Sequence, residues 1–125
     1  MRIAADVLRG YTDTILLRRL ADEDSYGYRI NRKVGEISEG NVELKEATLY
    51  TAFRRMEEGG LIRSYWGSEE TGARRRYYAL TDAGRQRLAE ETENWKATRR
   101  ILDLLLGGTE EKEASSEEWE EKAYE

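Results

Sequence analysis

The spacing of the apolar residues changes at Gly59-Gly60, and this change constrains the fold more than any other feature of the chain. Before the two glycines, apolar side chains recur every three to four positions, which predicts amphipathic helices. After them the period falls to about two, which is typical of strands, and a last helical stretch follows. The expected elements are helices over residues 9–21, 26–39 and 45–58, strands over 61–66 and 74–80, and a helix over 82–106.

Residues at the element boundaries support this division. Ser25 and Thr81 are expected to cap the second and the last helix, because a side-chain oxygen can accept a hydrogen bond from an unpaired amide of the first turn. Asp82 suits the positive first turn of the last helix. The segment 67–73 is polar and flanked by glycine, which predicts a flexible hairpin tip.

The order helix, helix, helix, hairpin, helix predicts a winged helix-turn-helix. The fold class is therefore mainly α with a two-stranded β-hairpin, an α+β arrangement. We expect residues 1–81 to form the winged domain and residues 82–106 to form a dimerisation helix. The last helix is long for so small a domain, and Leu88, Trp95 and Leu102 recur in it every seven residues.

The net charge of −5 is distributed unevenly along the chain. Residues 107–125 hold eight acidic and two basic residues, a net of −6, and are expected to form a disordered acidic tail. The rest of the chain has a net charge of +1. Because a basic face can serve a nucleic acid on a nearly neutral domain, the positions of the bases matter more than the total.

The absence of cysteine and histidine excludes several kinds of chemistry. Disulfides, thiolate metal sites, a cysteine nucleophile and the usual neutral-pH general base are all missing. We find no paired-carboxylate motif, phosphate-binding glycine loop or metal-ligand spacing, so we predict that the protein is not an enzyme and has no metal or cofactor. No apolar run approaches the about 20 residues of a membrane span and no signal peptide is recognisable, so we expect a cytoplasmic protein that contacts no membrane.

Bases and hydroxyls gather on the two elements that a winged helix presents to DNA, its third helix and its hairpin. Each basic side chain that neutralises a phosphate releases counterions, and hydroxyls suit phosphate oxygens or base edges. Duplex DNA is therefore the expected partner. The expected DNA-contacting residues are Tyr28, Lys45, Thr48, Tyr50, Thr51, Arg54, Arg74, Arg75 and Arg76, and Arg55 lies beside them.

Two alternatives remain open at this point. Winged helices also serve as protein-binding modules, so the basic hairpin could meet an acidic protein and the chain could be an adaptor that does not bind DNA. The acidic tail could be a solubilising segment, or it could compete with DNA for the basic hairpin. A steep fall of duplex affinity with salt would distinguish DNA binding from the adaptor.

Four motifs resemble those of the PadR family of transcriptional regulators. Tyr26-Gly27-Tyr28 resembles the family's motif in the second helix, and Ala47-Thr48-Leu49-Tyr50 resembles its recognition-helix motif. Glu57 to Ile62 resembles Glu-x-x-Gly-Leu-Ile, and Arg75 to Thr81 resembles the wing motif Arg-Lys-Tyr-Tyr-x-Leu-Thr. The resemblance covers most of the chain from Leu8 to Leu106. It implies a homodimeric repressor that binds a two-fold symmetric operator, often that of a transporter operon or of its own gene.

The single long C-terminal helix is similar to the small branch of this family. Residues 46–51 and 64–67 look most like those of a multidrug-sensing lactococcal member. The chain departs from the family in having no proline, since many members have proline where this sequence has Thr51 and Ala73. The departure at Thr51 restores a backbone donor and adds a hydroxyl, and it leaves the operator sequence open.

The last helix carries a stripe formed by Leu88, Glu91, Trp95, Arg99 and Leu102, which would face the partner in a dimer. Trp95 is then either an interface anchor or, as the resemblance to multidrug-sensing members implies, one wall of a slot for a planar aromatic effector. Glu91 could pair with a cationic ligand or with Arg99 across the dimer. The expected ligand-binding residues are Leu8, Tyr11, Thr14, Leu17, Glu91, Trp95 and Arg99.

Overall fold

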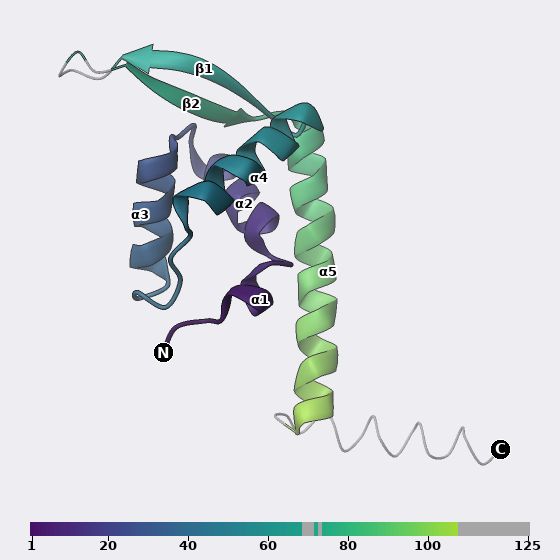
Figure 1. Cartoon of the computed structure of the whole chain (residues 1–125). Coiled ribbons are helices and arrows are strands. Elements are labelled where there is room, and N and C mark those ends of the chain that lie inside the picture. Colours follow the sequence, from purple (N-terminus) through teal and green to yellow (C-terminus); the bar gives the residue numbers. More distant parts are fainter. Residues whose placement is uncertain (69–71, 73, 108–125) are drawn as a thin grey trace. The chain divides into compact units, whose positions relative to one another are not determined.

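The computed structural model of the chain describes residues 1–68, 72 and 74–107. The predicted architecture of three helices, a hairpin and a long last helix is confirmed, with one short helix added at the start (Figure 1). The elements are α1 (Ala5–Leu8), α2 (Thr12–Asp22), α3 (Gly27–Ile37), α4 (Glu46–Glu58), β1 (Ile62–Ser68), β2 (Arg74–Leu80) and α5 (Asp82–Leu106).

The first predicted helix, over residues 9–21, differs most from the structure. The chain forms the four-residue α1, turns through Gly10, and begins α2 only at Thr12. Thr12 is buried and its hydroxyl donates to the Leu8 carbonyl at 3.0 Å, which links the two helices. One turn of helix has too few residues to show a period, so the apolar spacing could not reveal α1.

Phe53 of α4 is at the centre of the core. Its ring is fully buried and stacks on Tyr78 of β2, with centroids 4.1 Å apart. Helices α2 and α3 supply half of the remaining buried side chains around this pair, and α4 crosses in front of α2 in Figure 1. The buried cluster consists of Leu16, Leu17, Leu20, Ile30, Val34, Leu44, Leu49, Ala52, Phe53, Met56, Ile62 and Tyr78.

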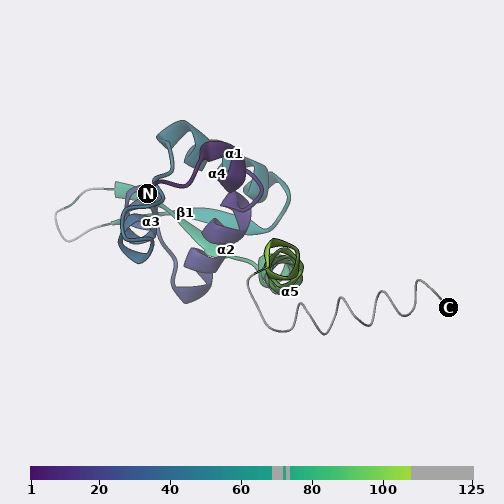
Figure 2. The same ribbon diagram turned by 90° about the horizontal axis from the view of Figure 1, so that it is seen from below.

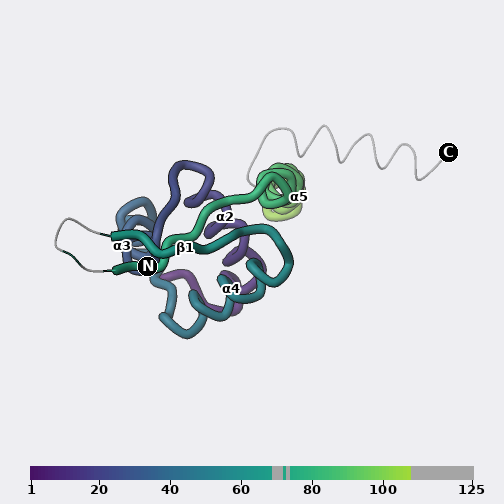
Figure 3. Tube along the Cα trace, turned by 90° about the horizontal axis from the view of Figure 1, so that it is seen from above, coloured from purple at the N-terminus to yellow at the C-terminus, as the bar shows by residue number. Residues whose placement is uncertain are grey.

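The hairpin is antiparallel, with Ile62 opposite Leu80 at its base and Ser68 opposite Arg74 at its far end. A short bridge joins it to the start of α3, because the amides of Ser25 and Tyr78 each donate to the other's carbonyl, at 3.1 and 2.7 Å. Seen from above, the hairpin extends from the end of α4 to beyond α3 (Figure 3). The predicted flexible tip falls largely on residues 69–71 and 73, outside the described residues.

The two predicted helix caps have different outcomes. The amide of Gly84 donates to the Thr81 hydroxyl at 3.0 Å, which confirms the cap of α5. The prediction for Ser25 is wrong, because α3 begins after Tyr26 and has no side-chain cap. The hairpin bridge holds the Ser25 backbone two residues before the start of the helix, and the Ser25 hydroxyl accepts a hydrogen bond from Arg29 Nε at 2.9 Å.

The chain divides into two compact units, residues 1–89 and 90–125, and α5 crosses the boundary. In the first unit Leu88 packs against the core. In the second unit the described part of α5 continues to Leu106, and Gly107 follows with a φ of 82°. The predicted acidic tail lies outside the described residues from position 108 onward. In the described part of the chain, no helix is long and apolar enough to cross a membrane.

Candidate nucleic-acid interface

Helix α4 divides its residues between the core and the surface. Its buried residues are Leu49, Ala52, Phe53 and Met56, which recur at helical spacing and fix the helix on the core. The opposite face is therefore turned to solvent and carries hydroxyls and bases. The expected DNA-contacting residues at Lys45, Thr48, Tyr50, Thr51 and Arg54 are all exposed on α4 or at its N-cap.

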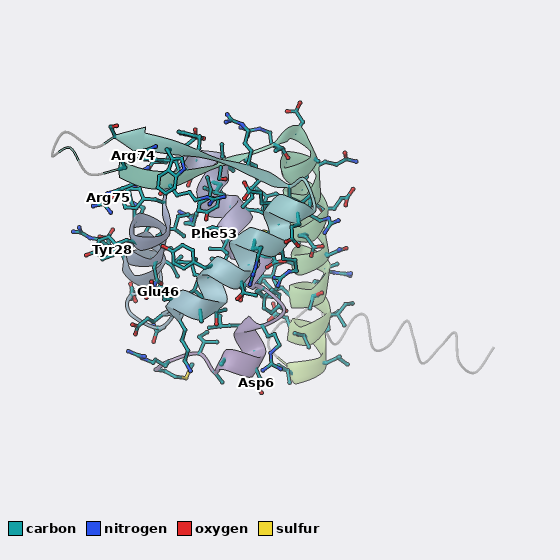
Figure 4. The ribbon with its side chains drawn as sticks, turned by 45° about the horizontal axis from the view of Figure 1, so that its top comes forward. Asp6, Tyr28, Glu46, Phe53, Arg74 and Arg75 are labelled. Atoms are coloured by element: carbon teal, nitrogen blue, oxygen red, sulfur yellow. The ribbon has the colours of Figure 1, made fainter. Side chains whose placement is uncertain are left out.

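Tyr50 and Tyr28 border a groove of about 560 Å³ between α3 and the start of α4. Tyr50 lies directly over Gly27, where a Cβ atom would be 2.8 Å from the phenol oxygen, so glycine is needed for this close approach. Tyr28 is 69% exposed and points outward from α3 (Figure 4). Both aromatic side chains that the sequence assigned to DNA therefore lie along one groove beside α4.

Asn31 fixes the turn that leads into α4. Its side-chain amide donates to the Leu44 carbonyl at 2.8 Å, and its oxygen accepts from the Leu44 amide at 3.1 Å. These two bonds satisfy the backbone of a segment that has no regular structure. Asn31 is not among the residues predicted from the sequence, although an asparagine in a helix that precedes a turn is a recognisable signal.

The three consecutive arginines of β2 have different surroundings. Arg74 is exposed, and its guanidinium lies 5.1 Å from the ring centroid of Trp66. Arg75 is half-buried, with its guanidinium 4.6 Å from the ring centroid of Tyr26. Arg76 lies 3.2 Å from a carboxylate oxygen of Glu57. Figure 4 shows Arg74 and Arg75 at the end of the hairpin that lies toward α3. The run therefore does not present three equivalent charges.

A group of tyrosines joins the hairpin to the start of α3. Tyr77 stacks on Tyr65 across the strands at 5.6 Å and meets Tyr26 edge-on at 5.4 Å. Gly67 makes room for this stack, because a Cβ atom there would lie 2.5 Å from the Tyr77 ring. Arg29 lies over the Tyr26 ring at 5.0 Å. These contacts hold the hairpin against α3, and the sequence analysis did not assign a role to Tyr65 or Tyr77.

Two phenols in this region have a pKa raised by their surroundings. The Tyr65 hydroxyl donates to an Asp24 carboxylate oxygen at 2.6 Å, and this hydrogen bond, more than burial, raises the pKa of Tyr65 above its ordinary value of 10.0. Burial is the main cause that raises the pKa of Tyr78. The folded state therefore favours the neutral form of both phenols.

Arg55 belongs to a different contact from its neighbour Arg54. Its guanidinium pairs with the Asp13 carboxylate of α2, although the two residues are 42 positions apart in the sequence. This pair ties α4 to α2. Arg54 and Arg55 are both exposed, so the two adjacent arginines differ in this ion pair and not in their exposure.

The expected effector residues occupy both units. Leu8, Tyr11 and Thr14 are half-buried in the first unit, and Glu91, Trp95 and Arg99 lie on α5 in the second. Leu17 is 1% exposed and belongs to the core. Likewise, Leu88 contacts the core of its own chain.

Among the described residues, no group of three acidic side chains could hold a metal ion.

Residues 16–90 match the family described as transcriptional regulator PadR-like. The chain is also 35% identical over 108 residues to an uncharacterised protein X from Lysinibacillus sphaericus, a match that covers 86% of this chain and 99% of the relative. No function is attached to that relative, so the family description carries the functional information.

Two solved structures have the same arrangement of elements. A transcriptional regulator from Clostridium thermocellum is 42% identical, with 79% of this chain and 96% of the other aligned at a TM-score of 0.73. A PadR family transcription regulator from Clostridium difficile is 35% identical, with 77% and 98% aligned at a TM-score of 0.67. The family match, the winged-helix fold and the exposed basic face agree, and the chain belongs to the PadR-like family of transcriptional regulators.

Proposed function

We propose that this DNA-binding regulator is a dimeric repressor that recognises a two-fold symmetric operator. Helix α4 enters the major groove of each half-site, and the hairpin reaches the neighbouring backbone or minor groove. The observation that carries the proposal is the division of α4 into a core face and an exposed face with hydroxyls and bases. The relatives are described as transcriptional regulators, so they give no support to the adaptor alternative.

Dimerisation is supported by apolar side chains on the second unit. Trp95, Ile101, Leu102, Leu105 and Leu106 of α5 are between 41% and 82% exposed in the single chain. Exposed apolar residues at such a density mark an interaction surface, and a second copy of the same helix is the partner that the family resemblance implies.

Selection of bound duplexes from random DNA tests the main proposal. A two-fold symmetric consensus is expected, and its absence would contradict a dimeric operator. Arg54→Ala should lower affinity for the selected duplex and reduce the slope of log affinity against log salt by about one unit. Lys33→Ala is the matched control, because Lys33 is an exposed base that borders a different pocket, between α2 and α3.

The effector part of the proposal concerns Trp95, whose indole is 41% exposed. A planar aromatic ligand stacked on Trp95 and its partner would bind the dimer geometries unequally, and DNA affinity would then depend on the ligand. A planar aromatic cation should quench tryptophan fluorescence in the native chain and less in Trp95→Phe. Equal quenching in both proteins, or unchanged DNA affinity, would rule out this site.

A further inference from the structure

A three-residue contact joins the wing to the recognition helix. Glu57, near the end of α4, places Oε1 3.2 Å from an Arg76 nitrogen of β2, while its Oε2 accepts a hydrogen bond from the Ser64 hydroxyl of β1. The same Arg76 nitrogen lies 2.9 Å from Ser64 Oγ, which closes the triangle. Both carboxylate oxygens are therefore used, and each strand of the hairpin is tied to α4. We call this contact the wing latch.

The Arg76 guanidinium is also held from a second side. It lies over the Tyr78 ring, 6.0 Å from its centroid, and Tyr78 in turn stacks on buried Phe53 of α4. The charge of Arg76 is therefore paired with Glu57, and its guanidinium plane lies on the Tyr78 ring. Glu57 belongs to α4, and Tyr78 contacts α4 through Phe53. Arg74 differs, because its guanidinium lies over exposed Trp66 of the hairpin itself.

Arg74 and Arg76 differ in how strongly their surroundings would attract a phosphate. The carboxylate of Glu57 offsets the charge of Arg76 at short range, so little net positive charge is left there for the DNA backbone. If Arg76 moved to a phosphate, Glu57 would be left unpaired beside polyanionic DNA and would repel it. If Arg76 instead stays with Glu57 and holds the wing, Glu57 keeps its ion pair and its charge remains offset near the DNA.

We infer that the wing latch sets the position of the hairpin relative to α4, and that Arg76 is a positioning residue for DNA binding rather than a phosphate ligand. This inference rests on the proposed DNA-binding function, and it changes the role expected for Arg76 from the sequence. It also gives Glu57 and Ser64 a role in operator binding.

The sign of the effect of Glu57→Gln distinguishes the two roles. If Arg76 binds phosphate, removing the competing carboxylate should raise DNA affinity. If the latch positions the wing, the same change should lower affinity, by roughly fivefold for the loss of one exposed charged pair. Glu58→Gln removes the same charge from the adjacent exposed residue and is expected to leave affinity unchanged or to raise it slightly.

The salt dependence gives a second measurement on the same selected duplex. Arg76→Met should lower affinity without changing the salt slope, whereas Arg74→Met should reduce the slope by about one unit. Hydroxyl-radical footprints of Glu57→Gln and Arg76→Met should lose protection at the flanks of the site and keep it at the centre. A higher affinity for Glu57→Gln, or a lower slope for Arg76→Met, would overturn the inference.

Amide hydrogen exchange of the full chain without DNA tests the latch separately from the proposed function. The strand amides of β1 and β2 should exchange faster in Glu57→Gln and Arg76→Met than in the native chain or Glu58→Gln. Unchanged exchange would show that no latch exists, even if DNA binding is normal. Faster exchange in a protein whose native form binds no duplex would instead refute the proposed function and leave the latch standing as a structural contact.

Discussion

Gly84, in the first turn of α5, is in the closest backbone contact among the described glycines. A Cβ atom at this position would lie 2.1 Å from the Leu61 carbonyl oxygen, which comes just before β1. The helix can start here only because glycine has no side chain, and the Thr81 hydroxyl then caps it. This one residue therefore fixes how the hairpin leads into α5.

Gly84→Ala should lower the free energy of unfolding by roughly 1–3 kcal/mol or more, because the backbone of Leu61 must move to admit the methyl group. Gly35→Ala is the matched control on α3, where a Cβ atom meets nothing within 4 Å. That variant should gain up to about 1 kcal/mol from the better helix propensity of alanine. Urea unfolding measures both, and equal values for the two variants would contradict the close contact.

Tyr65 gives a prediction about pH. Its raised pKa means that the folded state favours the neutral phenol, so this stabilisation is complete below pH 10.0 and is lost as pH rises through the folded pKa. The difference between ultraviolet titrations of the native chain and Tyr65→Phe should show one phenol that ionises above pH 10.0. A difference curve centred at or below 10.0 would contradict the hydrogen bond to Asp24.

Single residues were predicted well where local chemistry decides their role. Thr81 caps α5 because capping depends only on the next three residues. Ser25 has the same chemistry, but its backbone is paired with Tyr78, 53 positions away, and it caps nothing. Leu17 lies on the helix that was expected to line the effector slot, but its side chain is buried in the core. Such contacts between distant segments leave no local trace in the sequence.

At the scale of single elements, the adjacent residues Arg54 and Arg55 of α4 differ in their ion pairing. Both are exposed, and Arg55 pairs with Asp13 of α2. The 3.6-residue period assigned both to one polar face, and it could not show that an acidic residue of α2 would reach one of them. The sequence predicted the type of each element, but it could not predict which surface charges form ion pairs with other elements.

Arg55→Ala should therefore leave the salt slope of duplex binding unchanged and destabilise the fold by about 0.2–1 kcal/mol, the usual value of an exposed pair. Arg54→Ala is expected to do the opposite, with a lower slope and little change in stability. Fluorescence anisotropy at several salt concentrations and urea unfolding would measure the two effects. A reduced slope for Arg55→Ala would assign Arg55 to the DNA interface after all.

At the scale of the whole molecule, the sequence predicted the architecture because each element carries its own period and boundary residues. The sequence also predicted a partner-facing stripe on α5. Trp95 and Leu102 of this stripe are exposed in the single chain, whereas Leu88 packs against the core, and dimerisation through α5 stays a prediction. These patterns could not predict which side chains pair between different elements. The wing latch joins residues 7 to 19 positions apart on three elements, and such pairing depends on the fold that the elements make together.

Leu105→Glu should shift the protein from dimer to monomer, because Leu105 is 71% exposed and a charge would have to be desolvated at a partner surface. Lys96→Glu changes an exposed residue of the same helix and controls for charge. Sedimentation velocity at several concentrations is the measurement. A native chain that is monomeric at all concentrations, or a Leu105→Glu variant that remains dimeric, would refute dimerisation through this part of α5.

The first residues of the chain run alongside the turn between α3 and α4. The N-terminal end of the chain is drawn close to α3 and α4 (Figure 2). The Ile3 amide donates to the Asn41 carbonyl at 2.9 Å, and Arg2 pairs with Glu43 at 3.1 Å. Arg2 borders the same groove as Tyr28 and Tyr50. If α4 enters the major groove as proposed, an affinity tag or fusion partner joined ahead of Met1 would emerge beside α4 and obstruct the DNA, so purification tags for binding work belong at the other end of the chain.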